Sequence, residues 1–525
     1  MTILRVILLV LLTAVVLGTG LAVYWLQDAN NLKPEIEKLI SQNSDYNVRI
    51  RGDMDWQLFP PLTLRMADVE ARQEDQLIEV AQLQLDMDLS AIWQDTSQWQ
   101  VRELHLQDTR LQQADSELLV QSLDLMAFRF NQPAPFELTA QMRNLGPGDD
   151  TTAEEQEAAA PLSMDLAGTV TVRPEQPGTP QTIEFSDTDF ALSQADTQAN
   201  GRCDMVVTDT GQANTDTEEN TGEDDTLLPL DLLQAFAIQA NCQVASAQLA
   251  GETFTNSKLE LHNRDGRLHV MLDTPDFFAG QLATDVTVQL DEVPVQWQIV
   301  PEVTGVDSER LLAWAEQDLQ WVAMIGMNST MTMQGNTAAS LANTVQAQST
   351  FDGGEGTINV SKIKQQLARI ALLSGKSEEV AAWPDVWAYE DFTGDWLVNG
   401  REHTLNFVLD NMQVDAKGDY DYLAESIDML AHVTVHNTEN SPFKINPILA
   451  GTAIPVRCRG DAADPDCKLD ERASRNIIAK ALQRDDESGL RAKLEQKIDE
   501  EVPEEYRETA RNILELLGRS LERTE

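Results

Sequence analysis

Residues 81–90, Ala-Gln-Leu-Gln-Leu-Asp-Met-Asp-Leu-Ser, alternate apolar and polar side chains at every step. Successive side chains of a β-strand point to opposite faces, so this stretch predicts a strand with one apolar and one wet face. One-sided strands of this kind are typical of antiparallel sheets, whereas parallel strands are usually buried on both faces. The stretch therefore favours an antiparallel sheet with a single apolar face.

The same alternation recurs in residues 136–142, 282–290, 405–409 and 427–435. Turn-forming residues are expected to separate such runs, as in Asn263-Arg-Asp-Gly266 and Asp415-Ala-Lys-Gly418. Strands joined by short polar turns predict antiparallel meanders in a mainly β protein. A second sheet, helices or a groove for acyl chains would each cover the apolar face, and the alternation alone does not choose among them.

A few helices are expected to interrupt the strands. Residues 307–324 and 361–374 each place apolar side chains three and four positions apart, which is helical spacing. Residues 471–525 show the same spacing and predict an amphipathic helical tail.

Residues 6–26 form an uncharged apolar run of 21 residues. As a helix this run would be about 31 Å long, enough to cross a bilayer. Arg5 precedes the run and Tyr24-Trp25 lie near its far end, which predicts a cytoplasmic N-terminus (residues 1–5) and an external remainder. The alternative is a cleaved signal peptide, but the run is long and ends in Tyr-Trp-Leu instead of a small-x-small site.

The rest of the chain divides by composition into residues 27–145, 146–230 and 231–470, followed by the tail. The first and third parts carry the clearest strand patterns. The middle part contains two insertions, 146–160 and 208–226, and the second holds seven acidic residues and no basic one. Such segments bury too little apolar surface to offset their ordering entropy, so both are expected to be solvated.

The formal net charge of −49 argues against nucleic acid as a partner, because phosphate binding needs lysine and arginine. No HExxH, GxSxG or strand-linked GxGxxG motif occurs. Gly375-Lys-Ser377 resembles the end of a phosphate loop, but Ile370 occupies the position of the required first glycine. No catalytic residue, metal site or cofactor is expected.

Acidic pairs and histidines offer no further site. Asp53/Asp55, Asp86/Asp88 and Asp419/Asp421 are expected to share the solvent face of a strand, as alternate residues do. His432 and His436 lie on the polar face of a predicted strand without evident metal partners.

Four cysteines occur, without any CxxC spacing. Behind a membrane anchor an even number favours disulfides. Cys458 and Cys467 flank a turn-rich stretch and are predicted to pair, which would leave Cys203 with Cys242; the alternative is four reduced, buried thiols.

Two regions carry a family resemblance. Near the N-terminus these are Leu32-Lys-Pro-Glu-Ile-Glu37, Val48-Arg-Ile-Arg-Gly-Asp-Met-Asp-Trp-Gln-Leu-Phe-Pro-Pro61 and Leu62-Thr-Leu-Arg-Met-Ala-Asp-Val69. Near the C-terminus they are Gly354-Glu-Gly356 and Ile454-Pro-Val-Arg457 before Gly460 and Asp464-Pro465. In order and spacing the chain resembles the AsmA family. The cysteines around Asp464-Pro465 and the acidic tail depart from that pattern.

The resemblance implies a long, curved, groove-like antiparallel sheet in the periplasm, anchored in the inner membrane by residues 6–26 and related to bridge-type lipid-transfer proteins. It implies phospholipid as a partner and a role in lipid transport or outer-membrane assembly. The groove candidates are the apolar residues of the alternating runs: Leu83, Leu85, Met87, Leu89, Phe136, Leu138, Val286, Val288, Leu290, Leu405, Phe407, Leu409, Val433 and Val435.

Two other functions remain open from sequence. The protein could be a scaffold that binds outer-membrane protein precursors or an envelope assembly partner without carrying lipid, for example through a sheet edge. An envelope enzyme is the third hypothesis, and no residue constellation supports it.

Overall fold

The computed structural model describes residues 29–43, 46–57, 62–73, 76–87, 100–113, 116–144, 160–177, 179–211, 226–317, 320–361, 364, 382–437, 444–445, 450–462 and 465–469. The chain separates into two compact units. Unit 1 comprises Met1–Ala213 and Ala235–Glu260, and unit 2 comprises Asn214–Gln234 and Leu261–Glu525.

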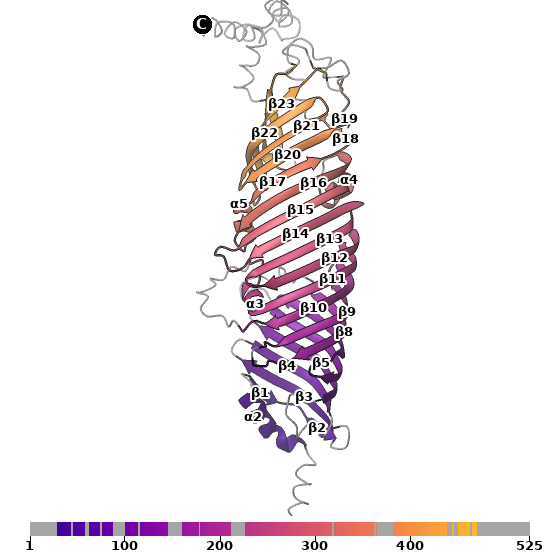
Figure 1. The fold of residues 1–525 in the computed structure, drawn as a ribbon, viewed down its shortest axis with the longest axis vertical. Helices are drawn as coiled ribbons and strands as arrows, with labels where there is room; N and C mark the ends of the chain where they lie inside the picture. The colour runs from indigo at the N-terminus through magenta and orange to yellow at the C-terminus, as the bar shows by residue number, and fades with distance from the viewer. Residues whose placement is uncertain are drawn as a thin grey trace, which may run out of the picture. The chain divides into compact units, whose positions relative to one another are not determined.

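Unit 1 is an antiparallel meander that starts behind a short helical segment (Figure 1). Its elements are η1 (Ala29–Leu32), α2 (Lys33–Asn43), β1 (Asn47–Ile50), β2 (Met54–Gln57), β3 (Leu62–Gln73), β4 (Gln76–Met87), β5 (Gln100–Gln113), β6 (Ser116–Arg129), β7 (Ala134–Asn144), β8 (Leu162–Arg173), β9 (Thr182–Gln194), β10 (Thr197–Asp209) and β11 (Phe236–Leu249). Strands β3 to β11 pair in series, from β3–β4 to β10–β11, and β1 and β2 both pair with β3.

The boundary between the units falls within β12 (Glu252–Arg264). The other elements of unit 2 are α3 (Leu230–Ala235, up to Gln234), β13 (Arg267–Phe277), β14 (Gly280–Gln289), β15 (Gln296–Asp307), α4 (Ser308–Trp314), β16 (Trp321–Gln334), α5 (Ala338–Thr344), β17 (Gln346–Asp352), β18 (Gly356–Asn359), β19 (Val386–Tyr389), β20 (Phe392–Asn399), β21 (Glu402–Leu409), β22 (Met412–Asp421), β23 (Ser426–Val435), β24 (Ile454–Asp461) and β25 (Asp466–Leu469).

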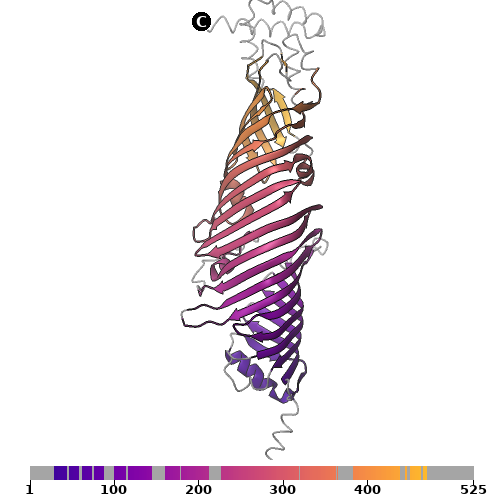
Figure 2. The same ribbon diagram turned by 45° about the vertical axis from the view of Figure 1, so that its right-hand side comes forward.

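Unit 2 is also built on an antiparallel meander, which Figure 2 shows from a second side. Strands β13 to β17 pair in order, β17 then pairs with β20, and β20 to β25 continue the series. Strands β18 and β19 form a small branch that joins the first half of β16. This branch places a second layer of side chains beside the C-terminal strands.

The prediction of a mainly β, antiparallel fold with few helices is therefore confirmed. The alternating runs at 136–142, 405–409 and 427–435 lie in β7, β21 and β23, and the turn at Asn263–Gly266 separates β12 from β13. Residues 81–87 lie in β4, and 282–289 lie in β14.

Two local predictions are wrong. Helix α4 ends at Trp314, and the predicted helix 307–324 gives way to strand β16 from Trp321 onward. Asp307 caps α4 by accepting hydrogen bonds from the amides of Glu309 and Arg310. The predicted turn Asp415–Gly418 lies inside strand β22, where residue 418 pairs with Met429.

Several predictions fall mainly outside the described residues. These are the apolar run 6–26, Leu89, most of the two insertions, nearly all of the predicted helix 361–374, and the tail 471–525. In the described part of the chain, no helix is both long and apolar enough to cross a membrane.

Candidate functional site

The strand register of unit 1 assembles aliphatic side chains into rows that run across the sheet. One row joins Leu85, Leu104 and Leu125 to Phe136, and a parallel row joins Met66, Leu83, Leu106, Leu123, Leu138 and Leu166. Side chains directly opposite each other in such pairs are close enough to pack. The rows form what we call the apolar face of unit 1.

Irregular residues keep these rows on one side of the sheet. Met66 and Val69 are three residues apart, so a regular strand would point them to opposite faces. Both nevertheless pack against the cluster of Ala29, Ile50 and Met54. Asp68, which lies between them, adopts a left-handed backbone with φ of 49° and breaks the alternation.

Strand β5 has the same kind of interruption, a residue with a left-handed backbone, next to the same rows. Asp108 has φ of 48° and lies between Leu106 and Thr109, which pair with Leu123 and Val120 of β6. The interruptions are in register across the strands, so the apolar rows continue on both sides of the irregular residues. Bulge-like irregularities of this kind also bend and twist a sheet.

The apolar face of unit 1 is only half-buried. Leu83, Leu85, Leu106, Leu123 and Leu138 all keep part of their side-chain surface in contact with solvent. In the described part of the chain, the main packing partners of strands β4 to β9 are their neighbours in the sheet, and helix α2 packs on β1. A row of partly exposed leucines is a surface that other apolar groups can bind.

Unit 2 carries a similar apolar face. Val270, Val286, Ile299 and Met331 pair in series across β13 to β16 and are half-buried. The row beside it continues from Val288 through Trp297 to Met333. This second row is covered in part, because Leu228, Leu230 and Leu233 pack against Leu268, Val288, Leu290 and Val295.

The C-terminal strands of unit 2 enclose a closed core. Trp383 and Trp387, together with Ile445, cover Leu409, Val433 and Val435. The Trp321 indole N–H donates to the Tyr389 hydroxyl over 2.7 Å. The Tyr389 hydroxyl in turn donates to the Gly353 carbonyl oxygen over 3.1 Å. Burial raises the pKa of the Tyr389 hydroxyl, so this group remains a donor at neutral pH.

The predicted groove residues thus fall into two classes by exposure. Half-buried on an apolar face are Leu83, Leu85, Leu138, Val286, Leu405 and Phe407. Fully buried are Met87, Phe136, Val288, Leu290, Leu409, Val433 and Val435. Side chains of the first class keep part of their surface exposed, although Phe407 packs against the closed core. Side chains of the second class are buried in the sheet.

Sequence reasoning missed a polar cluster on the apolar face of unit 2. His403 is 3% exposed, and its Nδ1 accepts a hydrogen bond from the Trp396 indole N–H over 3.1 Å. Its Nε2 lies 3.0 Å from the hydroxyl of Tyr422, and the rings of Tyr420 and Tyr422 flank it. Because Nδ1 accepts, Nε2 carries the proton and donates to Tyr422.

Burial lowers the pKa of His403, against the opposing effect of the Asp419 carboxylate. The imidazole is therefore neutral at pH 7. A signal for this site exists in the sequence: His403 has the same strand parity as Leu405, Phe407 and Leu409, so it belongs to the apolar face.

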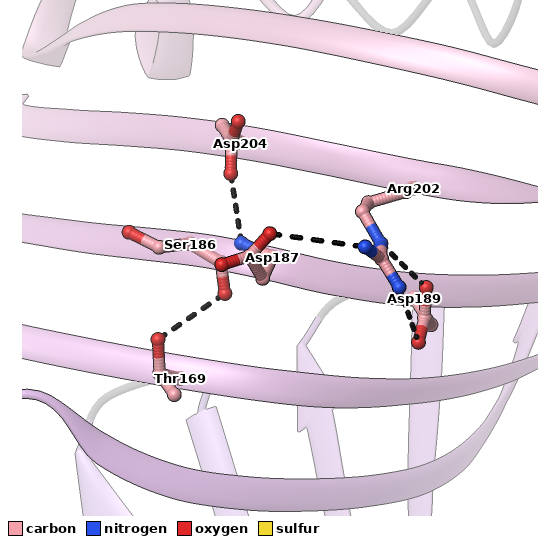
Figure 3. Close-up of polar contacts among 6 residues, drawn as sticks. All are labelled: Thr169, Ser186, Asp187, Asp189, Arg202 and Asp204. Atoms are coloured by element: carbon pink, nitrogen blue, oxygen red, sulfur yellow. Dashed lines mark hydrogen bonds and ion pairs between the residues drawn. The ribbon is translucent and has the colours of Figure 1, made fainter.

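The opposite face of each sheet is wet, and it carries ion pairs between side chains of neighbouring strands. Figure 3 shows one example on β9 and β10, where the Arg202 guanidinium contacts Asp189 at 2.9 Å and 3.3 Å. The Asp204 carboxylate accepts a hydrogen bond from the Asp187 amide over 2.7 Å. In unit 2, hydrogen bonds from Arg457 and Arg459 lower the pKa of Asp428 to about 2.

A cavity of about 500 Å³ also opens beside the irregular residues of unit 1. Its charged lining includes Arg51, Glu70, Glu79 and Arg110. Arg51 pairs with Glu70, and Arg110 lies 3.8 Å from Glu79. These four side chains therefore have charge partners within the protein itself.

Within the described ranges, no group of three or more histidine, cysteine, aspartate or glutamate residues could hold a metal ion. Asp421, from the acidic pair Asp419/Asp421, forms an ion pair with Arg401 at 2.8 Å. It also accepts hydrogen bonds from the backbone amides of Leu423 and Ala424. His432 lies on β23 opposite Asp415 and Pro455.

Both predicted disulfides are confirmed. Cys203 is bonded to Cys242 across β10 and β11, and Cys458 is bonded to Cys467 across β24 and β25. In each case the two residues are directly opposite in the strand register. The C-terminal disulfide also packs against the closed core of unit 2.

Comparison with known proteins agrees with the N-terminal resemblance. The model of the AsmA family matches residues 1–124, which include β1 to β5 and the start of β6. Neither curated proteins nor solved structures gave a match. The N-terminal resemblance is therefore confirmed: residues 1–124 match the AsmA family.

Proposed function

We propose that this protein is a non-enzymatic component of envelope biogenesis that binds phospholipid acyl chains on its apolar sheet faces. The observation that carries the proposal is the set of half-buried leucine rows on unit 1. Each CH₂ group removed from water by such a surface contributes about 0.8 kcal/mol. Acyl chains offer many CH₂ groups, so modest cover by a sheet is sufficient for binding.

An apolar sheet face that borders on water suits both parts of a phospholipid. The leucine rows accept the acyl chains, whereas the polar headgroup remains in water. The AsmA family match and the confirmed disulfides support a place in the cell envelope. We further propose that residues 6–26 anchor the chain in the inner membrane, with the bulk of the chain in the periplasm, where it aids lipid transport to the outer membrane or outer-membrane assembly.

Site-specific photo-crosslinking in cells tests this proposal. A photoreactive residue replaces Leu85 on the apolar face, and the matched control replaces Gln84, the next residue on β4, which lies opposite Arg65 on the wet face. We expect phospholipid adducts at position 85 and none at position 84. Equal lipid labelling at both positions, or none at either, would refute lipid binding by the apolar face. Protein adducts at position 85 would instead support a scaffold that binds envelope protein precursors.

A further inference from the structure

A short segment of unit 2, Thr226–Gln234, covers one margin of that unit's apolar face. We call this segment the strap. Its Leu228, Leu230 and Leu233 pack against the sheet residues Leu268, Val288, Leu290 and Val295. Val270 and Val286 of the next row adjoin the same cluster. The strap thus places leucine side chains where another aliphatic ligand would otherwise contact the sheet.

Side-chain amides hold the strap in place. The Asn336 side chain accepts the Leu228 amide N–H over 3.0 Å and donates to the Leu228 carbonyl oxygen over 2.9 Å. The Asn263 side chain donates to the Leu233 carbonyl oxygen over 2.6 Å. Gln234 of the strap donates to the Leu290 carbonyl oxygen over 3.3 Å. A backbone hydrogen bond from the Leu227 amide to the Asn336 carbonyl oxygen over 2.9 Å and an isolated bridge between Thr226 and Thr337 complete the attachment, so the strap is held at a few points.

The strap buries little of its own surface. Leu227 is 49% exposed and Leu232 is 58% exposed, and no residue of α3 is fully buried. A helix of six residues has almost no stability apart from its contacts. Few cooperative interactions therefore oppose its release from the sheet.

We propose that the strap is a displaceable cover: acyl chains that enter the apolar face of unit 2 replace Leu230 and Leu233 on Val288 and Leu290. This inference rests on the proposed function, because it assumes that acyl chains are the ligand. Strap and ligand bind the same aliphatic side chains, so each weakens the other. A ligand that binds only the uncovered state shifts the protein toward that state, and a weaker strap must raise lipid occupancy.

The test uses the full chain with a photoreactive residue at Val286, beside the strap, in three backgrounds. The first background is unchanged, the second carries Leu230→Ser and Leu233→Ser, and the third carries Leu232→Ser as a matched control on the exposed side of the strap. We expect several-fold more lipid adduct at position 286 in the second background only. A photoreactive residue at Leu83 in unit 1 serves as a reference for lipid binding.

Each outcome separates the two ideas. Lipid adducts at position 83 with equal yields at position 286 in all backgrounds would overturn the strap while leaving the proposed function intact. No lipid at position 83 or 286 would overturn both. Asn336→Ser loosens the strap from the sheet side without touching its leucines, and it must raise the yield at position 286 as well. Hydrogen exchange of β13 to β15 verifies that unit 2 stays folded in each variant. If the leucine double variant unfolds, the yield at position 286 in Asn336→Ser tests the proposal in its place.

Discussion

A single leucine on the apolar face has a double role. Leu123 lies between Leu106 and Leu138, so it contacts neighbours on both sides, yet it is only half-buried. The same surface that stabilises the sheet is therefore available to a ligand. This dual use distinguishes Leu123 from Leu409, whose 2% exposure leaves no surface for binding.

We predict that Leu123→Asp abolishes lipid binding by unit 1, because a carboxylate placed in the row repels apolar chains. The loss of half-buried apolar surface should cost about 1–2 kcal/mol of unfolding free energy, so unit 1 stays folded. Ser122→Asp, on the wet face between Gln107 and Thr139, is the matched control and should retain lipid. Lipid bound equally by the two variants, measured after extraction, would contradict the assignment of the face.

His403 gives a pH-dependent contribution to the stability of unit 2. Its folded pKa is below the value of 6.5 for an unperturbed histidine, because burial disfavours the charged ring. The unfolded chain then binds more protons than the folded one as the pH falls below 6.5. The His403 contribution is fully present above that pH and is lost progressively below it.

We therefore predict that His403→Gln reduces the acid sensitivity of unit 2. Denaturant unfolding at pH 7.5 and pH 5.5 should show a smaller loss of stability in the variant than in the unchanged chain. Glutamine keeps one donor and one acceptor for Trp396 and Tyr422, so the cluster remains hydrogen-bonded. An identical loss in both proteins would show that His403 does not titrate in this window.

At the scale of the element, the sequence pattern predicts strands better than their irregularities. Regular alternation in the second half of β4, in β7 and in β23 identifies these strands, because one side of the sheet is apolar there. Asp68 and Asp108 break the pattern at left-handed positions. Their effect depends on the register of neighbouring strands, which the local sequence does not contain.

The predicted helix 307–324 shows why spacing alone can mislead. Leu311 and Leu312 belong to α4, but Val322 belongs to β16 and is 45% exposed. The Ser308 hydroxyl donates to the Trp321 carbonyl oxygen and accepts the Ala323 amide, which ties the helix start to the next strand. This long-range contact decides where the helix must end, and periodicity does not reveal it.

The sequence predicts a turn at Gly418, but this residue lies in β22 where the backbone of β23 comes close to it. A Cβ at this position would lie 2.1 Å from the Asp428 carbonyl oxygen and 2.5 Å from the Met429 Cα. We predict that Gly418→Ala destabilises unit 2 by about 1–3 kcal/mol through overpacking. Gly326→Ala in β16, where the nearest atom would be 3.5 Å away, is the control and should cost less than half as much in denaturant unfolding.

The two disulfides close loops of different length, with sequence separations of 39 and 9. In the chain-entropy model, the longer loop stabilises the folded state by roughly 4 kcal/mol and the shorter by roughly 3 kcal/mol. We predict that replacing Cys203 and Cys242 by alanine destabilises β10 and β11 more than the equivalent change destabilises β24 and β25. Hydrogen exchange of the four strands measures this difference, and a reversed order would contradict it.

At the scale of the whole molecule, the chain combines strong acidity with one-sided sheets. A net charge of −49 favours the solubility of the wet surfaces. Solubility of this kind allows each unit to keep a half-exposed apolar face. The sequence predicted this face in both units, but it did not predict which rows are covered by the strap or by Trp383 and Trp387, because those contacts join distant segments.

The most direct test of lipid binding is native mass spectrometry with lipid extraction on the chain purified without added lipid. The account predicts co-purified phospholipid in a defined stoichiometry, retained in Ser122→Asp and reduced in Leu123→Asp. A well-folded protein without lipid, or with the same lipid content in both variants, would contradict the claim that the apolar rows bind acyl chains.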